Sequence, residues 1–271
     1  MNILDQIISH KRKEVDERKS LYPVKLLEKS IYFDSPVVSL KKYLLREDKV
    51  GIIAEIKRKS PSKGIINQHV SIERTSIGYM QAGASALSIL TDTEFFGGKS
   101  EDLTIARKFN YCPILRKDFT IDEYQVVEAK SIGADVILLL ANVLSEKEIE
   151  ELAKFAKSLG LEVLLEIRDK KELKSVNEYV DIVGINNRNL KDFSVNVNQS
   201  FELADMIPSN FVKISESGID SAKTILELRK AGFKGFLMGE RFMKHSRPEV
   251  TCTGFIKEIK ELQTGKLQPV A

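Results

Sequence analysis

Eight short apolar runs alternate with helix-forming segments along this sequence, and this alternation limits the possible fold more than any other feature. The runs are typical of β-strands and comprise residues 51–57, 86–90, 112–117, 135–141, 161–167, 181–186, 211–217 and 235–240. The helical segments comprise residues 71–83, 101–109, 122–133, 145–160, 169–180, 198–207, 220–232 and 250–263. Strict alternation of this kind predicts a mainly parallel sheet that is covered by helices.

The number of strand–helix units decides between two α/β architectures. Several strands are nearly continuous apolar runs, as expected where both faces of a strand are buried. Eight units in about 200 residues fit a closed (β/α)8 barrel. An open doubly wound sheet would carry a G-x-G-x-x-G turn after its first strand, and this sequence has none there. We therefore predict an α/β fold consisting of a single (β/α)8 TIM barrel.

The residues before the first strand predict a separate helical extension. Apolar side chains at Ile3, Leu4, Ile7, Ile8 and Val15 recur at helical spacing, opposite a strongly charged face. We expect residues 1–48 to form an N-terminal helical extension packed on the barrel, residues 49–264 to form the barrel, and residues 265–271 to form a C-terminal tail.

Composition and charge argue against several classes of protein. Hydrophobic residues make up 42% and charged residues 30%, which suits a globular chain, and the net charge of +3 gives no support for a nucleic-acid partner. The N-terminal sequence is too charged for a signal peptide, and the longest apolar run, VILLLANVL, is too short to span a membrane. The chain has two cysteines, so we expect a reducing, cytoplasmic compartment and no membrane partner.

The first strand, GIIAEIK, carries charges on one of its faces. In isolation, Glu55 and Lys57 would form a solvated face opposite Ile52, Ala54 and Ile56. In a parallel barrel, however, the outer face must be apolar because it packs against helices. We therefore expect Glu55 and Lys57 to point into the barrel near its carboxyl-end mouth, where each compensates the charge of the other.

Other strands also end in polar residues. Lys117 ends the third strand, Glu166 lies near the end of the fifth, and Asn186 and Arg188 share a face at the end of the sixth. A single charge at a strand end usually begins a solvated loop. Because the carboxyl ends of barrel strands surround one mouth, several such ends together predict an active site.

Two glycines indicate where an anion would bind. Gly218 follows the seventh strand and Gly239 follows the eighth, and barrels often bind phosphate through these two loops. Glycine lets the backbone approach phosphate oxygens closely. Both could instead be ordinary turn glycines, but their joint placement favours phosphate binding.

Histidine and cysteine do not suggest a further centre. His10, His69 and His245 are scattered and lack metal-ligand spacing, so we expect no metal. Cys112 opens a strand and is interpreted as a small core residue rather than a nucleophile.

Taken in order, these segments resemble a known family. IAEIKRKSPSKG, PILRKDFTIDEYQV, LLEI, GINNRNL, ISESGI and MGE are similar to motifs of indole-3-glycerol-phosphate synthase of tryptophan biosynthesis. The resemblance covers roughly residues 3–262, and it implies that the N-terminal extension lies over the barrel mouth. It implies a carbon–carbon lyase (a carboxy-lyase) without metal or organic cofactor. Its phosphosugar–anthranilate substrate, 1-(2-carboxyphenylamino)-1-deoxyribulose 5-phosphate, would undergo ring closure, decarboxylation and dehydration to indole-3-glycerol phosphate.

The resemblance also implies roles for individual residues. Lys117 matches the general acid of ring closure, and Glu166 matches the general base. Lys57 matches the lysine that pairs with the substrate carboxylate and assists dehydration, and Glu55 matches the carboxylate that orients its neighbours. The remaining matches are active-site polar positions at Asn186 and Arg188, and phosphate-binding positions at Ser60, Ser217, Gly218, Gly239 and Glu240. Glu240 is expected to act through its backbone N–H.

This sequence departs from the family pattern at Arg168, Asn189, Arg241 and Phe242, none of which is a proposed acid or base. Two rival interpretations stay open. A phosphoribosylanthranilate isomerase would need a Cys/Asp pair at its strand ends, and a barrel that only binds phosphosugars would need no acid or base. We expect a monomer, and association with other tryptophan-pathway enzymes stays open.

Overall fold

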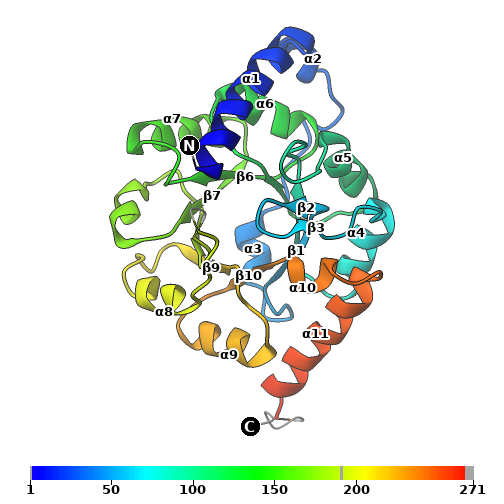
Figure 1. The fold of residues 1–271 in the computed structure, drawn as a ribbon, viewed down its shortest axis with the longest axis vertical. Helices are drawn as coiled ribbons and strands as arrows, with labels where there is room; N and C mark the ends of the chain where they lie inside the picture. The colour runs from blue at the N-terminus through cyan, green and yellow to red at the C-terminus, as the bar shows by residue number, and fades with distance from the viewer. Residues whose placement is uncertain (1, 190–191, 266–271) are drawn as a thin grey trace.

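The computed structural model describes residues 2–189 and 192–265, and eight parallel strands close into a barrel at its centre (Figure 1). Around the ring each strand pairs with its neighbours in the order β1, β10, β9, β8, β7, β6, β5, β4, and β4 pairs again with β1. The strands are β1 (Ile52–Ile56), β4 (Ala86–Leu90), β5 (Ile114–Lys117), β6 (Val136–Leu140), β7 (Glu162–Ile167), β8 (Ile182–Asn186), β9 (Val212–Glu216) and β10 (Gly235–Met238). The predicted (β/α)8 TIM barrel is confirmed.

Helices connect successive strands and surround the barrel (Figure 1). They are α4 (Ile72–Gln81), α5 (Ser100–Phe109), α6 (Glu123–Ser131), α7 (Glu146–Ser158), the 3-10 helix η1 (Lys170–Ser175), α8 (Asn198–Ala204), α9 (Ala222–Lys230), α10 (Glu240–Met243) and α11 (Pro248–Gln263). Local sequence determines several helix ends. Ser145 and Glu148 form the capping box of α7, and Gly160 follows that helix with a φ of 77°.

One predicted helix is much shorter than expected. Residues 169–180 have helical spacing, but only the single 3-10 helix η1 forms there. Asp169 accepts hydrogen bonds from the N–H groups of Lys171 and Glu172, while the Glu172 carboxylate accepts one from the Arg168 N–H. These local side-chain bonds satisfy the backbone in a tight turn, so a longer α-helix is not required.

The alternation of side chains on β1 follows the barrel rule. Ile52, Ala54 and Ile56 belong to the hydrophobic core between strands and helices, whereas Ile53 belongs to the core inside the barrel. Glu55 is therefore on the inner side with Ile53, two residues further along the strand. The predicted inward orientation of the charged face is confirmed for Glu55, which is buried.

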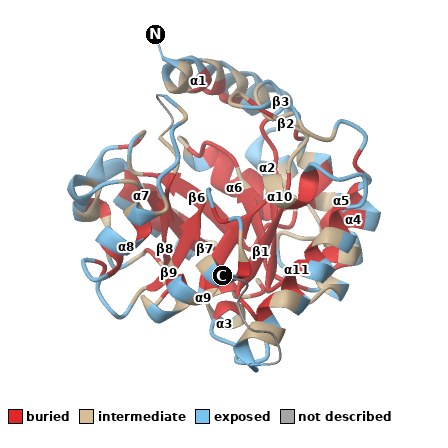
Figure 2. Cartoon of the chain, turned by 60° about the horizontal axis from the view of Figure 1, so that its bottom comes forward, coloured by how far each residue is buried: buried red, intermediate tan, exposed pale blue. Residues whose placement is uncertain are grey.

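The N-terminal extension consists of α1 (Ile3–Leu21), α2 (Val24–Leu27) and α3 (Leu40–Leu44). Figure 2 shows α1 above one end of the strands and α3 below the other. Ile7 of α1 packs into the inner core at the carboxyl end. Leu40 and Leu44 of α3 are buried in the same inner core, beside strand starts such as Ile182 and Val212. The extension thus covers the mouth, as expected, and also closes the opposite end.

A short hairpin follows β1 on the mouth side. Its strands are β2 (Lys59–Ser60) and β3 (Gly64–Ile65), which pair in antiparallel fashion. The guanidinium of Arg58 holds the base of the hairpin by contacting the Asp102 carboxylate and donating to the Gly97 carbonyl. Residues 266–271 of the expected C-terminal tail lie outside the described residues.

None of the helices within residues 2–189 and 192–265 combines the length and apolar character of a membrane span.

Candidate active site

A cavity of about 180 Å³ occupies the carboxyl end of the barrel, beneath α1 and the β2–β3 hairpin. It is lined by every residue that the sequence analysis proposed for the site. These are Glu55, Lys57, Ser60, Lys117, Glu166, Asn186, Arg188, Ser217, Gly218, Gly239 and Glu240. The barrel therefore gathers the predicted acids, bases and loop residues from β1, β5, β7, β8, β9 and β10 around one space.

Lys117 lies at the centre of the polar cluster. Its Nζ is 2.9 Å from Oε2 of Glu166 and 2.8 Å from Oε2 of Glu216. Burial by itself favours the neutral amine, but the two carboxylates hold the pKa of Lys117 well above its ordinary value. Lys117 is therefore a protonated ammonium that can donate to a strongly basic oxygen formed beside it.

Glu216 belongs to this cluster, although the sequence analysis did not single it out. It is 2% exposed, and burial raises its pKa to about 7 while the Lys117 ammonium opposes that shift. A sequence signal was present, because Val212 and Ile214 point into the barrel and Glu216 follows them at the same period of two. A side chain at Gly184 on β8 would collide with Oε1 of Glu216, so this glycine leaves room for it.

Glu55 and Lys57 form the second charged pair of the cavity. Nζ of Lys57 lies 2.6 Å from Oε1 of Glu55, which confirms the predicted pairing. Gly239 is close to this pair, since a Cβ added there would lie 2.6 Å from Oε1 of Glu55. One consequence of glycine at this position is therefore space for the Glu55 carboxylate, beside any approach of its backbone to an anion.

Asn186 and Arg188 extend the polar side of the cavity. The Asn186 amide donates to Oε1 of Glu166 over 2.7 Å and accepts from the Arg188 N–H over 2.9 Å. Nη2 of Arg188 lies 3.5 Å from Oε2 of Glu240, and Nζ of Lys63 lies 3.5 Å from Oε1. The Glu240 carboxylate is thus partly neutralised by two cations at the rim.

The loop after β9 has an unusual backbone conformation. Ser217 has a φ of 68° and Gly218 a φ of 73°, so two successive residues are in the left-handed region. A non-glycine residue there is uncommon and often occurs at functional sites. Gly218 also contacts the Val195 side chain so closely that a Cβ would collide with it. Ser60 reaches the cavity from the hairpin and is buried.

Part of the cavity wall is apolar, and this part was not predicted from the sequence. Its residues come from α1, from the loops after β4 and β5, and from the inner face of β6; they include Ile3, Leu4, Ile7, Phe96, Phe119, Leu138 and Leu140. A flat, unsubstituted aromatic ring would bury its surface against such a wall. The cavity thus combines apolar and charged lining residues.

Two of the family departures lie beside the site. Arg241 borders the cavity, and its guanidinium donates to the Asp220 carbonyl and stacks on the Phe255 ring at 4.5 Å. Phe242 is fully buried and packs against Tyr79 and Phe255.

Cys112, which was interpreted from the sequence as a core residue rather than a nucleophile, is buried. In the described part of the chain, no three His, Cys, Asp or Glu side chains are arranged to hold a metal ion.

A closed parallel barrel with a buried lysine–glutamate cluster in a cavity at its carboxyl end is typical of enzymes that act by acid–base chemistry. The family model of indole-3-glycerol phosphate synthase matches residues 4–254. The chain therefore belongs to the indole-3-glycerol phosphate synthase family, whose members are carboxy-lyases of tryptophan biosynthesis, and it has that activity.

Curated relatives with that name match almost the whole chain. The protein from Bacteroides thetaiotaomicron is 48% identical over 259 residues, which cover 96% of this chain and 99% of the relative. The protein from Thermoanaerobacter pseudethanolicus is 40% identical over 259 residues, covering 95% of this chain and 98% of the relative. One from Campylobacter jejuni is 40% identical over 247 residues, covering 89% and 95%.

Solved structures with similar folds are far more distant in sequence. The 3-hexulose-6-phosphate synthase of Salmonella typhimurium aligns with a TM-score of 0.60 at 12% identity, covering 80% of this chain and 100% of that one. A structure described as native KDPGal aligns with a TM-score of 0.58 at 14% identity, covering 79% and 96%. These likenesses concern the fold alone.

Proposed function

We propose that this chain forms indole-3-glycerol phosphate with Lys117 as the general acid of ring closure. The observation that carries the proposal is the Lys117 ammonium held between Glu166 and Glu216 inside the barrel mouth. The substrate is 1-(2-carboxyphenylamino)-1-deoxyribulose 5-phosphate. Its aromatic ring lies against the apolar wall, and its carboxylate and phosphate lie toward the charged groups of the cavity.

Ring closure begins when the aromatic carbon that bears the carboxylate attacks the ribulose carbonyl carbon. A carbon–carbon bond forms, and the carbonyl π electrons move to the oxygen. Lys117 donates its proton to that oxygen, which becomes a hydroxyl group. Because two carboxylates keep Lys117 protonated, the acid is present before the substrate arrives.

Decarboxylation restores aromaticity to the six-membered ring. The bond to the carboxylate breaks, and its electrons return to the ring system as carbon dioxide leaves. Lys57, which pairs with Glu55 in the free protein, exchanges that partner for the substrate carboxylate before this step. Glu55 then remains as the nearby charge that keeps Lys57 protonated and oriented.

Dehydration completes the indole ring. The new hydroxyl group leaves as water with a proton from Lys57, and Glu166 removes a proton from the ring system so that the double bond forms. Asn186 fixes the Glu166 carboxylate by donating to its Oε1. The side-chain oxygen of Asn186 in turn accepts a hydrogen bond from the backbone N–H of Arg188. The reaction releases one carbon dioxide and one water for each indole product.

The phosphate of the substrate binds at the loops after β9 and β10 and at the hairpin. The left-handed backbone at Ser217 and Gly218 can direct N–H groups at an anion. Ser60 contributes its hydroxyl, and Gly239 and Glu240 contribute backbone N–H groups. The Glu240 carboxylate stays outward with Arg188 and Lys63, so that it does not repel the phosphate.

The assay for this proposal is incubation of the purified protein with the carboxyphenylamino-deoxyribulose phosphate while indole fluorescence is recorded. Product fluorescence and carbon dioxide should appear in equal amounts. A folded protein that binds the substrate without producing either would instead be a non-catalytic phosphosugar-binding barrel.

Compartment and assembly are also proposals. We propose a cytoplasmic protein, supported by two cysteines that are both free and buried. We propose a monomer in solution, since one chain supplies every group of the site. Analytical ultracentrifugation with and without the other enzymes of tryptophan biosynthesis would test both self-association and association with those enzymes.

A further inference from the structure

Helix α1 contacts the barrel mouth through a buried lysine. Lys11 is 1% exposed, and its Nζ lies 2.9 Å from Oδ2 of Asp92 and 3.0 Å from Oδ1 of Asp118. Asp92 follows β4, and Asp118 follows β5. A buried ammonium is tolerated only where carboxylates surround it closely, so these contacts confine α1 to one place on the mouth.

The charges continue from Asp118 back to the same helix. Oδ2 of Asp118 lies 3.3 Å from Nη2 of Arg116, whose guanidinium also contacts the Glu128 carboxylate on α6. Glu128 in turn pairs with Arg18 of α1. Lys11, Asp118, Arg116, Glu128 and Arg18 thus form a sequence of alternating charges that starts and ends on α1, here called the α1–β5 charge chain.

The charge chain lies directly beside Lys117. Arg116 and Asp118 are its two neighbours in sequence; both are buried, and Asp118 also borders the cavity. Arg116 also donates to the Gln125 carbonyl over 2.9 Å, and Asp118 accepts from the Thr91 hydroxyl over 2.6 Å. Both neighbours of Lys117 are therefore fixed in a buried network.

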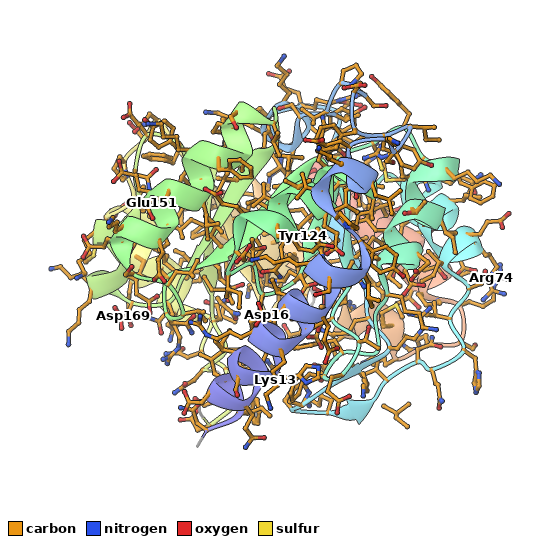
Figure 3. The ribbon with its side chains drawn as sticks, turned by 90° about the horizontal axis from the view of Figure 1, so that it is seen from above. Lys13, Asp16, Arg74, Tyr124, Glu151 and Asp169 are labelled. Atoms are coloured by element: carbon orange, nitrogen blue, oxygen red, sulfur yellow. The ribbon has the colours of Figure 1, made fainter. Side chains whose placement is uncertain are left out.

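Helix α1 has other contacts that attach it to the barrel, so the α1–β5 charge chain is not needed for attachment. Ile7 packs into the inner core, and the Tyr124 hydroxyl, labelled beside α1 in Figure 3, contacts the carbonyls of Arg18 and Tyr22. Buried ion pairs add little net stability compared with apolar packing, because both charges must be desolvated. A fully paired polar network instead fixes one geometry.

We propose that Lys11 and Arg18 are positioning residues for Lys117, acting through Asp118, Arg116 and Glu128. The N-terminal helix then holds the end of β5 at the place where the acid meets the substrate carbonyl, in addition to lining the cavity. This inference rests on the proposed role of Lys117 as the acid.

The test compares Lys11→Met with Lys13→Met, which removes an exposed lysine from the same helix (Figure 3). We expect Lys11→Met to lower kcat ~10–100-fold, the scale of a small misplacement of a catalytic group, with KM changed less than ~3-fold. Lys13→Met should match the wild type. A rise in KM with unchanged kcat would overturn the proposal, because it would mean that α1 only forms part of the binding wall.

A double-mutant cycle tests whether the effect of Lys11 on the reaction depends on Lys117. In a Lys117→Met background, measured by single turnover, Lys11→Met should have no further effect on the rate. The same fold-loss in both backgrounds would contradict the proposal. If Lys11→Met does not fold, the same cycle can be measured with Arg18→Met, because Arg18 is partly exposed and lies at the other end of the α1–β5 charge chain. A folded but inactive wild type would refute the proposed function itself, whereas an active wild type with unaffected Lys11 and Arg18 variants would refute only the positioning role.

Discussion

The two ends of the barrel are closed by different parts of the same N-terminal extension. At the amino end, Leu40 and Leu44 of α3 fill the space between the strand starts with apolar side chains. At the carboxyl end, α1 spans a cavity and is held by ion pairs of the buried Lys11 and the partly exposed Arg18 with buried carboxylates. Figure 2 shows the two helices on opposite sides of the strands.

The difference between these ends separates stability from chemistry. Burying a leucine side chain stabilises a fold by ~1.5–3 kcal/mol without demanding a particular orientation of polar groups. Buried charges add little stability, but they fix the directions in which their neighbours point. The amino end thus contributes to the stability of the barrel, whereas the ion pairs at the carboxyl end have the positioning role for Lys117 that we propose above.

Among substitutions that leave the net charge of the cavity unchanged, we expect Lys57→Arg to lower kcat the most. Arginine keeps the positive charge beside Glu55 but does not release a proton at neutral pH. If Lys57 supplies the proton for dehydration, kcat should fall ~100-fold while substrate affinity stays within a few-fold. Stopped-flow fluorescence resolves the dehydration step, and Lys13→Arg is the matched control. Full activity would show that Lys57 serves only as the anchor for the carboxylate.

At the other end, Leu44→Ala should affect stability rather than catalysis. The side chain is buried against Gly235 and the inner core, so truncation leaves a cavity that costs about 2–5 kcal/mol. Denaturant unfolding measures this loss, and Leu45→Ala, at an exposed position of the same segment, should change little. Turnover per folded molecule should match the wild type. A parallel loss of turnover would mean that the two ends are coupled.

The smallest effect concerns the pH dependence of stability. Folding raises the pKa of Glu216 from its ordinary 4.5 to about 7. The folded protein keeps this proton while the unfolded chain releases it, so the contribution of Glu216 to stability falls as the pH rises from about 4.5 through 7. Glu216→Gln should remove that decline. The free energy of unfolding in urea would be measured for both proteins between pH 5 and pH 8. If it changes with pH in the same way in both, Glu216 does not cause the decline.

The sequence predicted the barrel and most of the cavity because both follow from periodic patterns. Counting strand–helix units gave the closed sheet, and the need for an apolar outer face placed Glu55 and Lys57 inside. Glu216 was not predicted, because the SESG segment has the composition of a polar loop and its glutamate does not differ in type from a loop residue, although it is the last residue of β9.

Other features depend on contacts that no local pattern contains. Lys11 and Asp118 are more than one hundred residues apart in sequence, and in isolation Lys11 is simply one lysine of a charged helix. Likewise, Leu40 and Leu44 form a short apolar segment whose position at the amino end depends on packing against Gly235 and the inner core. The expected boundaries of the extension, barrel and tail stay a proposal.

The most direct test of the account is the behaviour of Lys117→Ala with its substrate. Equilibrium binding and single-turnover formation of indole would be measured on the same preparation, with Lys108→Ala, at an exposed position of α5, as control. We expect binding within ~10-fold of the wild type and a rate at saturation lowered at least ~100-fold, as for a lost general acid. A variant that loses affinity but turns over saturating substrate at the wild-type rate would contradict the assignment of Lys117 as the acid.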